Sequence, residues 1–351
     1  MAVLPSEGVN SMKNIVKELC RGFIVGCLIP ALLLTIVVAA ADPKADAHQT
    51  PSGTVTVPQL MIPTPTQSQQ EPTTPPAVLK QTIRVLHGDS LTEMDLEIYV
   101  MRVVLGEVPA DFDPEALKAQ AVVARTFALK LQENNRHGGG VCTRSSCCQS
   151  YRLEETYLEK GGTEEKLRKV REAVEATAGQ VLVYEGELIN ATYFSCSGGS
   201  TEDAVAVWGY DVPYLQAVES PGEEAASAYY REKIFTAEEF RKALAVQLKG
   251  EPSTWFGKVS YTEGGGVERM TIGGVSYKGT TLRSLLGLRS TMFTIHVEQG
   301  RIVVRMKGYG HRVGMSQYGA EAMALTGHDY TQILSHYYVG AVLTTYPLTD
   351  C

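Results

Sequence analysis

The stretch from Arg102 to Arg125 restricts the fold of this chain most, because it predicts a helix, a tight turn and a second helix in immediate succession. The apolar residues of the first helix recur at the three- and four-residue spacing of a single face: Leu96, Tyr99, Val100, Val103 and Val104. Gly106 and Pro109 predict its end. Asp113 is suited to cap the second helix, with Pro114 at the first helical position.

Glu107 lies where the first helix is expected to stop, just past its apolar stripe. The neighbours expected to wall it are apolar: Val104, Val108 and Phe112. A carboxylate in such surroundings is a candidate for a raised pKa and for proton transfer. Lys118 and Arg125 follow on the second helix, two turns apart, and share one face. The alternative is that Glu107 is a solvated helix-end residue and that the two cations form a wet face.

Residues 22–41 are almost uncharged and long enough to cross a hydrocarbon core of about 30 Å, which predicts a transmembrane anchor. Lys13, Lys17 and Arg21 precede this segment. By the positive-inside rule residues 1–21 are then a cytoplasmic tail, and everything after the anchor lies outside the cell membrane. A cleaved signal peptide, with small residues at 39–41, is the alternative.

Residues 42–80 are rich in Pro, Thr, Ser and Gln, and this composition predicts a disordered, extended linker rather than a packed core. Such a linker would hold the folded part of the chain away from the membrane. For the whole chain, a hydrophobic content of 44% supports a substantial core elsewhere. The net charge of −7 argues against a nucleic-acid partner, which would need a basic surface.

Residues 81–348 predict an α+β domain, because helices are mixed with local hairpins instead of alternating regularly with strands. We expect a first strand at 82–86 and a helix at 164–177. Hairpins are expected around Glu185-Gly186 and around Gln299-Gly300.

A smaller lobe is expected as an insertion at about residues 222–300. Thr236 and Glu239 predict a capping box that opens a helix reaching about Gln247. A last helix is expected over residues 329–340.

A Gly- and Cys-rich loop holds four side chains that together form the ligand set of a tetrahedral zinc site: His137, Cys142, Cys147 and Cys148. The spacing is not that of a standard zinc finger, and ligands from two adjacent residues are awkward around one tetrahedron. The alternatives are a disulfide, which an exported compartment would favour, or ordinary thiols.

Three blocks of this sequence resemble the signature of the stage II sporulation protein D family, and they occur in the family's order. They are LGEVPADFDPEALKAQAVVARTFA (105–128), YFSCSGGSTEDAVAVWGYDVPYLQAVESP (193–221) and GYGHRVGMSQYGAEAMA (308–324). The resemblance covers roughly residues 83–348.

The resemblance implies a membrane-anchored peptidoglycan lytic transglycosylase. Such an enzyme cleaves the bond between N-acetylmuramic acid and N-acetylglucosamine in glycan strands stripped of stem peptides, leaving a 1,6-anhydro product. It further implies septal wall remodelling and engulfment during sporulation, with the catalytic domain on the mother-cell side of the septum. The implied partners are stage II sporulation protein P, an amidase and endopeptidase, and stage II sporulation protein M, a membrane scaffold.

The resemblance also implies roles for particular residues. Glu107 would be the single catalytic acid and base. The expected substrate contacts are Lys118, Arg125, Tyr193, Ser197, Thr201, Tyr214, His311 and Gln317. Some relatives bind structural zinc through two His and two Cys, and here Cys147 stands where the second His would be. The loop is therefore expected to hold either a Cys3His zinc site or a disulfide without metal.

Other functions remain open from the residues alone. Ser195 with His311 could suggest a serine hydrolase, but SCSGG lacks the G-x-S-x-G elbow and no Asp is placed by a motif. Two further functions also remain open: the protein could be a non-catalytic enhancer of a partner amidase, or it could be a purely structural septal tether. Trp208 and Tyr210 could stack on sugar rings or fill the core, and we expect Trp208 to fill the core.

Overall fold

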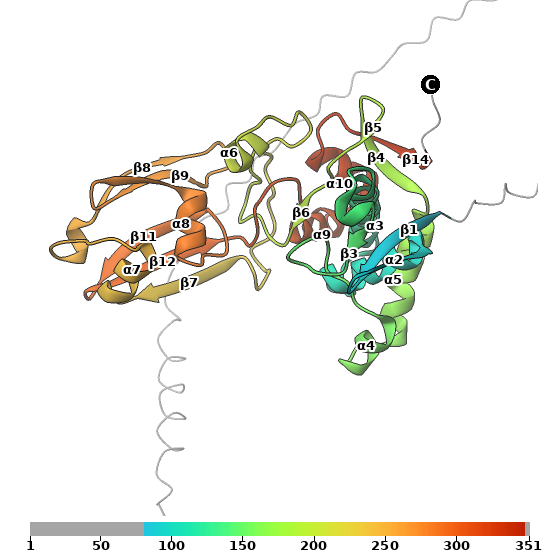
Figure 1. The fold of residues 1–351 in the computed structure, drawn as a ribbon, viewed down its shortest axis with the longest axis horizontal. Coiled ribbons are helices and arrows are strands. Elements are labelled where there is room, and N and C mark those ends of the chain that lie inside the picture. The colour runs from blue at the N-terminus through green and yellow to red at the C-terminus, as the bar shows by residue number, and fades with distance from the viewer. Residues whose placement is uncertain (1–80, 348–351) are drawn as a thin grey trace, which may run out of the picture. The chain divides into compact units, whose positions relative to one another are not determined.

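The computed structural model describes residues 81–347, and Figure 1 shows how their helices and strands are arranged. The predicted tail (1–21), anchor (22–41) and linker (42–80) lie outside the described residues. No helix between residues 81 and 347 combines the length and the apolar character needed to cross a membrane.

The larger of two hydrophobic cores is built mainly from helices. They are α2 (Leu96–Glu107), α3 (Pro114–Glu133), α5 (Glu164–Ala176), α9 (Gln317–Leu325) and α10 (Tyr330–Tyr337). Helix α3 is the central one, because it packs against each of the other four. Its residues are buried almost without interruption from Ala116 to Leu129, so it has no solvent-facing side in this stretch.

The helices begin at residues whose side chains cap them. The Asp113 carboxylate accepts a hydrogen bond from the backbone N–H of Glu115, and Pro114 follows at the first position of α3, both as predicted. Asp95 caps α2 in the same way, and Asp329 forms a capping box with Gln332 at the start of α10. Each such cap stabilises its helix by about 1 kcal/mol.

Three small sheets surround these helices. The first has the order β2 (Ser90–Asp95), β1 (Thr82–His87), β3 (Val141–Cys142), and the second the order β14 (Val342–Thr345), β4 (Gln180–Tyr184), β5 (Glu187–Leu188). The third is a two-residue parallel pair of β6 (Tyr193–Phe194) with β13 (Met315–Ser316). This last pair joins the second and third sequence blocks, which lie far apart in the chain.

The hairpin expected around Glu185-Gly186 is present but shorter than predicted. Strand β5 ends at Leu188, and Tyr193 and Phe194 leave the hairpin to pair with β13 instead. The hairpin between β1 and β2 escaped sequence analysis, because every residue of β2 is at least partly exposed and the strand has no buried apolar alternation. The helix predicted at 164–177 is α5, capped by Thr163 as expected.

A second, smaller core belongs to a lobe with two antiparallel sheets. One sheet has the order β10 (Val275–Lys278), β9 (Val267–Ile272), β8 (Phe256–Tyr261), and the other β11 (Phe293–Glu298), β12 (Arg301–Lys307), β7 (Tyr230–Phe235). Helices α7 (Ala237–Leu244) and α8 (Gly279–Leu285) complete it. The residues at its centre are Phe240, Ile272, Leu282 and Ile302. These elements are yellow to orange in Figure 1.

Two local predictions for this lobe are confirmed. Thr236 and Glu239 form the capping box of α7, and the hairpin around Gln299-Gly300 joins β11 to β12. Helix α7 ends at Leu244 rather than near Gln247, because Ala245 adopts a left-handed conformation with φ of 54°. Strand β12 continues to Lys307, beyond the predicted limit of the lobe near residue 300.

The structure is thus a mixture of helices and mostly antiparallel sheets, as the sequence predicts at this coarse level. The two parallel pairings among the described residues, β1 with β3 and β6 with β13, are each only two residues long. Helices α4 (Glu154–Glu159) and α6 (Ala204–Trp208) are short and contribute one buried residue each to the larger core, Tyr157 and Ala204.

Candidate active site

Glu107 is the last residue of α2, and its half-buried carboxylate is held by groups from distant parts of the chain. The backbone N–H of Ser150 donates to Oε1 at 2.6 Å, and the Gln317 side-chain amide donates to Oε2 at 3.5 Å. A Cβ atom at Gly106 would lie 2.7 Å from the backbone nitrogen of Tyr151. Only glycine at position 106 therefore lets the 150–151 segment come close enough to reach Glu107.

The carboxylate of Glu107 opens onto a cleft of about 260 Å³. The cleft is lined by residues from all three sequence blocks and from the Cys-rich loop: Glu107, Phe127, Ser145, Cys148, Thr192, Tyr193, Phe194, Ser195, Tyr309, Gly310 and His311. Glu107 is the one carboxylate among these lining residues. The pairing of β6 with β13 brings the second and third blocks to the same place.

Burial raises the pKa of Glu107, since the charged form loses hydration. Hydrogen bonds from the Ser150 N–H, from Tyr193 and from Gln317 favour the carboxylate and lower the pKa in part. Desolvation is the larger effect, so the net shift is upward, as predicted for an acid that must hold a proton.

Tyr193 lies beside Glu107 and presents a neutral hydroxyl. Burial, followed by the neighbouring Glu107 charge, holds the pKa of Tyr193 well above its ordinary value. Its hydroxyl accepts a hydrogen bond from the Gln149 side-chain amide at 2.9 Å, and its ring packs edge-on against Phe127. Tyr193 is thus fixed in orientation from two sides.

His311 lies on the wall of the cleft as a neutral imidazole at ordinary pH. Burial and the positive charge of Arg283 lower its pKa to about 4. Its Nδ1 accepts a hydrogen bond from the Val313 N–H at 3.1 Å, and a hydrogen bond with the Tyr193 backbone partly offsets the lowering of its pKa. No hydrogen bond joins His311 to Ser195 among residues 81–347, so the cleft lacks the activated serine of a hydrolase triad.

The rings beside His311 form an aromatic border. Phe194 and Trp208 contact its imidazole with centroid distances of 5.6 and 5.9 Å. Trp208 is half-buried and packs against the edge of the larger core, and it stacks on the exposed ring of Tyr210. The expectation that Trp208 fills the core is therefore only partly met.

Arg125 does not contact substrate, which corrects the sequence-based expectation. Its side chain is fully buried within the core, where it forms an ion pair with Glu97 at 2.5 Å and donates to the backbone carbonyl of Gln180. The substrate contact was expected from the family resemblance, and the helical spacing of Lys118 and Arg125 shows that the two residues share a face but not whether that face meets solvent.

Lys118 also lies outside the residues that line the cleft. Its ammonium pairs with Glu115 at 2.6 Å and lies over the ring of Tyr330. Its expected contact with substrate therefore has no support from the geometry of the Glu107 cleft.

Three residues of the central block (193–221), all expected to contact substrate, form hydrogen bonds with other parts of the chain. Ser197 is fully buried and donates to the Glu223 carboxylate, and Thr201 is fully buried and donates to the Gln216 carbonyl. The Tyr214 hydroxyl accepts from the Asn190 N–H. None of the three lines the cleft. Ser197 and Thr201 are fully buried, which corrects the substrate contacts expected for them, whereas Tyr214 is half-buried and its expected contact stays a prediction.

The four predicted metal ligands come together in the structure. The ligand atoms of His137, Cys142, Cys147 and Cys148 all lie within 4.8 Å of one another. The two distances from His137 Nε2 to a sulfur are 3.3 and 3.4 Å, close to the edge of about 3.6 Å that a tetrahedral zinc site requires. These cysteines are free thiols, which argues against the disulfide alternative. The donor set fits zinc.

Two neighbours of Glu107 were not identified from the sequence. Ser150 contributes a backbone N–H, which leaves no mark on residue type, so no sequence signal could have found it. Phe127 lies inside the first block and packs on Tyr193, but its apolar type fits the core equally well. Arg312, next to His311 and fully buried against Glu202, was also missed, although both residues lie within the matching blocks.

Comparison with known proteins agrees with this arrangement. Residues 87–184 match the family model "Stage II sporulation protein". The chain is 38% identical over 277 residues to stage II sporulation protein D of Bacillus amyloliquefaciens, covering 77% of this chain and 80% of that protein. It is 39% identical over 264 residues to stage II sporulation protein D of Bacillus subtilis, covering 73% and 76%.

A more distant relative carries a different name. The amidase enhancer of Bacillus subtilis is 29% identical over 305 residues, which span 70% of this chain and 40% of that protein.

The family model and these relatives define a cell-wall protein of sporulation. The chain belongs to the stage II sporulation protein D family.

Proposed function

We propose that this protein is a peptidoglycan lytic transglycosylase in which Glu107 is the general acid and then the general base. The observation that carries the proposal is a single carboxylate with a raised pKa among the residues that line the cleft. Hydrolytic glycosidases ordinarily need two carboxylates, one of them to activate water or to attack the sugar. A lytic transglycosylase needs one, because the substrate supplies its own nucleophile.

The proposed reaction balances without water. Glu107 donates its proton to the oxygen that links N-acetylmuramic acid to N-acetylglucosamine, and the bond from C1 to that oxygen breaks. The C6 hydroxyl oxygen of the same muramic acid then bonds to C1, and its proton passes to Glu107. The acid is thereby regenerated, and the product is a 1,6-anhydro sugar.

The surroundings of Glu107 suit both halves of this cycle. Desolvation favours the protonated acid before cleavage, as the first step requires. The Ser150 N–H and the Gln317 amide stabilise the carboxylate that exists between the two proton transfers. Neutral Tyr193 and His311 border the cleft and can hydrogen-bond sugar hydroxyls.

We also propose that His137, Cys142, Cys147 and Cys148 hold a structural zinc ion. Such an ion would supply a fixed cross-link and no open coordination site for chemistry. Support comes from the position of the cluster, because Cys148 lines the cleft and the Ser150 N–H that holds Glu107 follows two residues later.

The protein would act at the sporulation septum, anchored by residues 22–41 with its catalytic domain outside the cell membrane. Stage II sporulation proteins P and M would be its partners there. Both proposals rest on the family resemblance and on the apolar segment of the sequence.

The experiment is digestion of peptide-free glycan strands in water enriched in oxygen-18, with the products identified by mass spectrometry. The expected products are anhydromuramyl ends that carry no heavy oxygen, since water does not take part. Glu107→Gln should lower the rate by about 10²–10⁴-fold. Reducing ends labelled with oxygen-18 would contradict the proposal and indicate a hydrolase.

The second candidate function is enhancement of a partner amidase, which the likeness to the Bacillus subtilis amidase enhancer favours. An enhancer would raise amidase activity on intact walls equally well in the wild type and in Glu107→Gln. If the purified protein releases no anhydromuramyl product and the variant still enhances the amidase, this function replaces the first.

A further inference from the structure

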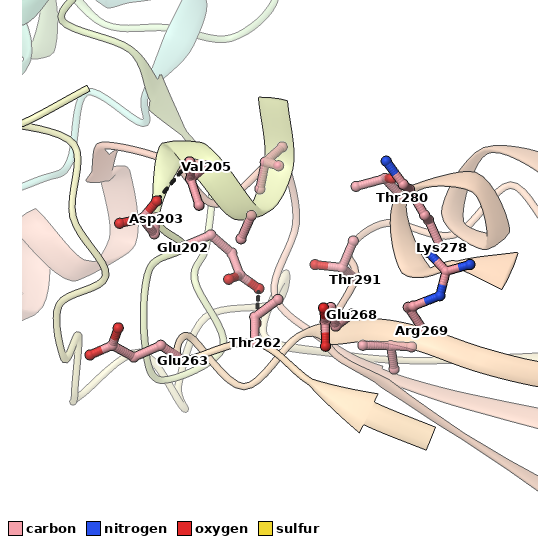
Figure 2. Close-up of a pocket in the computed structure, with 13 residues that line it drawn as sticks. Glu202, Asp203, Val205, Thr262, Glu263, Glu268, Arg269, Lys278, Thr280 and Thr291 are labelled. Carbon is pink, nitrogen blue, oxygen red and sulfur yellow. Dashed lines mark hydrogen bonds between the residues drawn. The ribbon is translucent and has the colours of Figure 1, made fainter. Parts of the chain in front are cut away.

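A second and larger cavity, of about 430 Å³, lies away from Glu107 and shares no lining residue with its cleft. It is formed by α6 and by β9, β10, α8 and the turns of the smaller lobe (Figure 2). Its lining is unusually rich in charged and hydroxyl side chains: Glu202, Asp203, Thr262, Glu263, Glu268, Arg269, Lys278, Thr280 and Thr291.

Two cations stand together on one side of this cavity. Arg269 and Lys278 are direct partners in the antiparallel pairing of β9 with β10, so both side chains leave the same face of the sheet. Figure 2 shows them next to each other. Neither forms an ion pair with a carboxylate of residues 81–347, although Arg269 does hydrogen-bond Ser276. Like charges placed directly opposite destabilise a sheet, and an anion bound between them would relieve that repulsion.

The buried end of the cavity carries unsatisfied polar atoms. Glu202 is 1% exposed, and its Oε1 accepts from Arg312 at 2.8 Å and from Thr262 at 3.0 Å. Its Oε2 has no partner among the described residues, and neither has the hydroxyl of Thr291, which is 5% exposed. A buried polar atom left without a partner costs about 1–3 kcal/mol.

Further acceptors continue from Glu202 towards the opening of the cavity. Asp203 uses Oδ1 to cap α6 at Val205, and Glu263 lies on the same side in Figure 2, opposite the two cations. Thr262 lies between these two carboxylates and the sheet. The cavity therefore has an acidic end, with unpartnered acceptors buried behind it, and an exposed basic end whose two cations form no ion pair among residues 81–347.

These carboxylates are not arranged as a metal site. Within residues 81–347, the one group of His, Cys, Asp or Glu side chains close enough to share an ion is the His137 cluster. A neutral sugar would satisfy the open acceptors but would leave Arg269 and Lys278 uncompensated. A ligand that matches both ends carries an N–H-rich cation at one end and a carboxylate at the other.

We propose that this cavity binds a short zwitterionic peptide. Its amino group would lie at Glu202 and Asp203, and its carboxylate would lie between Arg269 and Lys278. The amide groups between them would meet Glu268, Thr262 and Thr280. This site does not depend on the transglycosylase reaction, because none of these residues borders the Glu107 cleft.

The test is calorimetric titration of the purified full-length protein with trialanine and with two capped forms. N-acetylation removes the positive end, and C-terminal amidation removes the negative end. Each cap should weaken binding by at least about tenfold, the effect of one lost hydrogen bond to a charged group. Equal binding of capped and free peptide, or no heat of binding for free peptide up to about 10 mM, would overturn the proposal.

Variants connect the binding to these residues. Lys278→Met should weaken free trialanine about tenfold and abolish the loss caused by the C-terminal cap. Thr280→Val keeps the side-chain shape and should weaken binding without unfolding the lobe, whereas a change at Glu202 would also break its pair with Arg312. Lys258→Met, at an exposed position of β8 outside the cavity, is the matched control and should bind like the wild type.

Two further arms complete the experiment. Trialanine of D-configuration distinguishes two origins of the natural peptide ligand. Tighter binding of the D-form than of the L-form points to wall peptides, and tighter binding of the L-form points to a protein terminus. Glu107→Gln should bind the peptide as the wild type does, even where it has lost glycan cleavage. If Lys278→Met binds the free and the amidated peptide as tightly as the wild type does, the site is refuted whatever the outcome for Glu107.

Discussion

Glu107 carries the proposed chemistry at some cost to the fold. Its pKa is raised because the folded chain removes water from the carboxyl group, so folding favours the protonated form. A group of this kind stabilises the native state at pH values below its pKa in the unfolded chain. That contribution is lost as the pH rises through the higher pKa of the folded state.

Glu107→Gln is therefore expected to be more heat-stable than the wild type at pH 7.5, and equally stable below about pH 4, where both side chains are neutral. The measurement is the melting temperature of both proteins across this pH range. The exposed Glu224→Gln variant is the control and should show no such pH-dependent gain. A lower melting temperature for Glu107→Gln at pH 7.5 would mean that the carboxylate stabilises the fold.

At the residue scale, the sequence predicts the role of a residue well when its type has a chemical purpose. It predicts that role poorly when the role depends on whether the side chain is buried. Glu107 could be predicted because it ends an apolar helix inside a recognisable block. Arg125 could not be placed correctly, since a cation in the middle of a core is rare unless paired. Its partner Glu97 is two residues after the cap of α2 and looks like an ordinary first-turn acid.

At the scale of elements, α3 is the central helix of the larger core, and its buried Arg125 side chain binds it to the neighbouring elements. The Arg125 guanidinium joins three elements, because it binds Glu97 of α2 and the backbone carbonyls of Val174 in α5 and Gln180 in β4. This arrangement explains why a helix with a buried arginine can be central to an apolar core: most of the donors of the guanidinium are satisfied.

Arg125→Met should lower the free energy of unfolding by about 3 kcal/mol, because it leaves Glu97 and two carbonyls without their donor. Denaturant unfolding measures this loss. The specific glycan-cleaving activity of the folded fraction should be unchanged if the role of Arg125 is structural. Lys118→Met, which removes a partly exposed pair, should cost about 1 kcal/mol or less. A selective rise in KM for Arg125→Met would restore the substrate-binding role.

The Cys-rich loop is the second element whose order matters to the cleft. Elemental analysis of the purified protein is expected to find one zinc per chain, and a strong chelator should remove it and lower the melting temperature. Cys142→Ser should reproduce the effect of the chelator. Cys196→Ala is the control: this buried thiol lies outside the cluster and hydrogen-bonds Glu223, so the variant should retain its zinc. Full occupancy in Cys142→Ser would exclude the site.

For the molecule as a whole, Arg312 links the central block to a turn of the smaller lobe. Its fully buried guanidinium donates to the carbonyls of Ser197 and Gly264 and pairs with Glu202 at 2.8 Å. Gly264 belongs to the turn between β8 and β9, whereas Ser197 and Glu202 belong to the central block. One side chain thus satisfies acceptors in two segments that are packed around different cores.

Arg312→Met should destabilise the protein by about 3–5 kcal/mol, because it leaves the Glu202 carboxylate buried and unpaired. Limited proteolysis should then cut the 262–266 turn faster than in the wild type. The surface variant Arg305→Met, which breaks pairs with Glu232 and Glu298 that remain partly exposed, should cost about 1 kcal/mol or less and leave the cutting rate unchanged. Equal protease resistance in Arg312→Met would show that other contacts hold the turn.

The sequence predicted the local elements of the molecule better than their long-range pairing. Caps, apolar stripes and hairpin turns are encoded by neighbouring residues, so α3, α5, α7 and the β11–β12 hairpin could be found. The pairing of β6 with β13 is only two residues long and joins segments more than a hundred positions apart. No periodicity reports such a contact, and only the order of the three blocks suggested that they meet.

This long-range pairing has a consequence for the stage of synthesis at which the proposed active site becomes complete. Glu107 and Gln317, which hydrogen-bond each other, are separated by 210 residues, and the wall of the cleft at Tyr309 to His311 lies near the end of the chain. A nascent chain that stops before Tyr309 would carry Glu107 with only part of the surface that encloses it. If Glu107 has the proposed role, fragments that lack residues 309–317 should be unable to cut wall polymer, so the order of synthesis would itself limit premature activity.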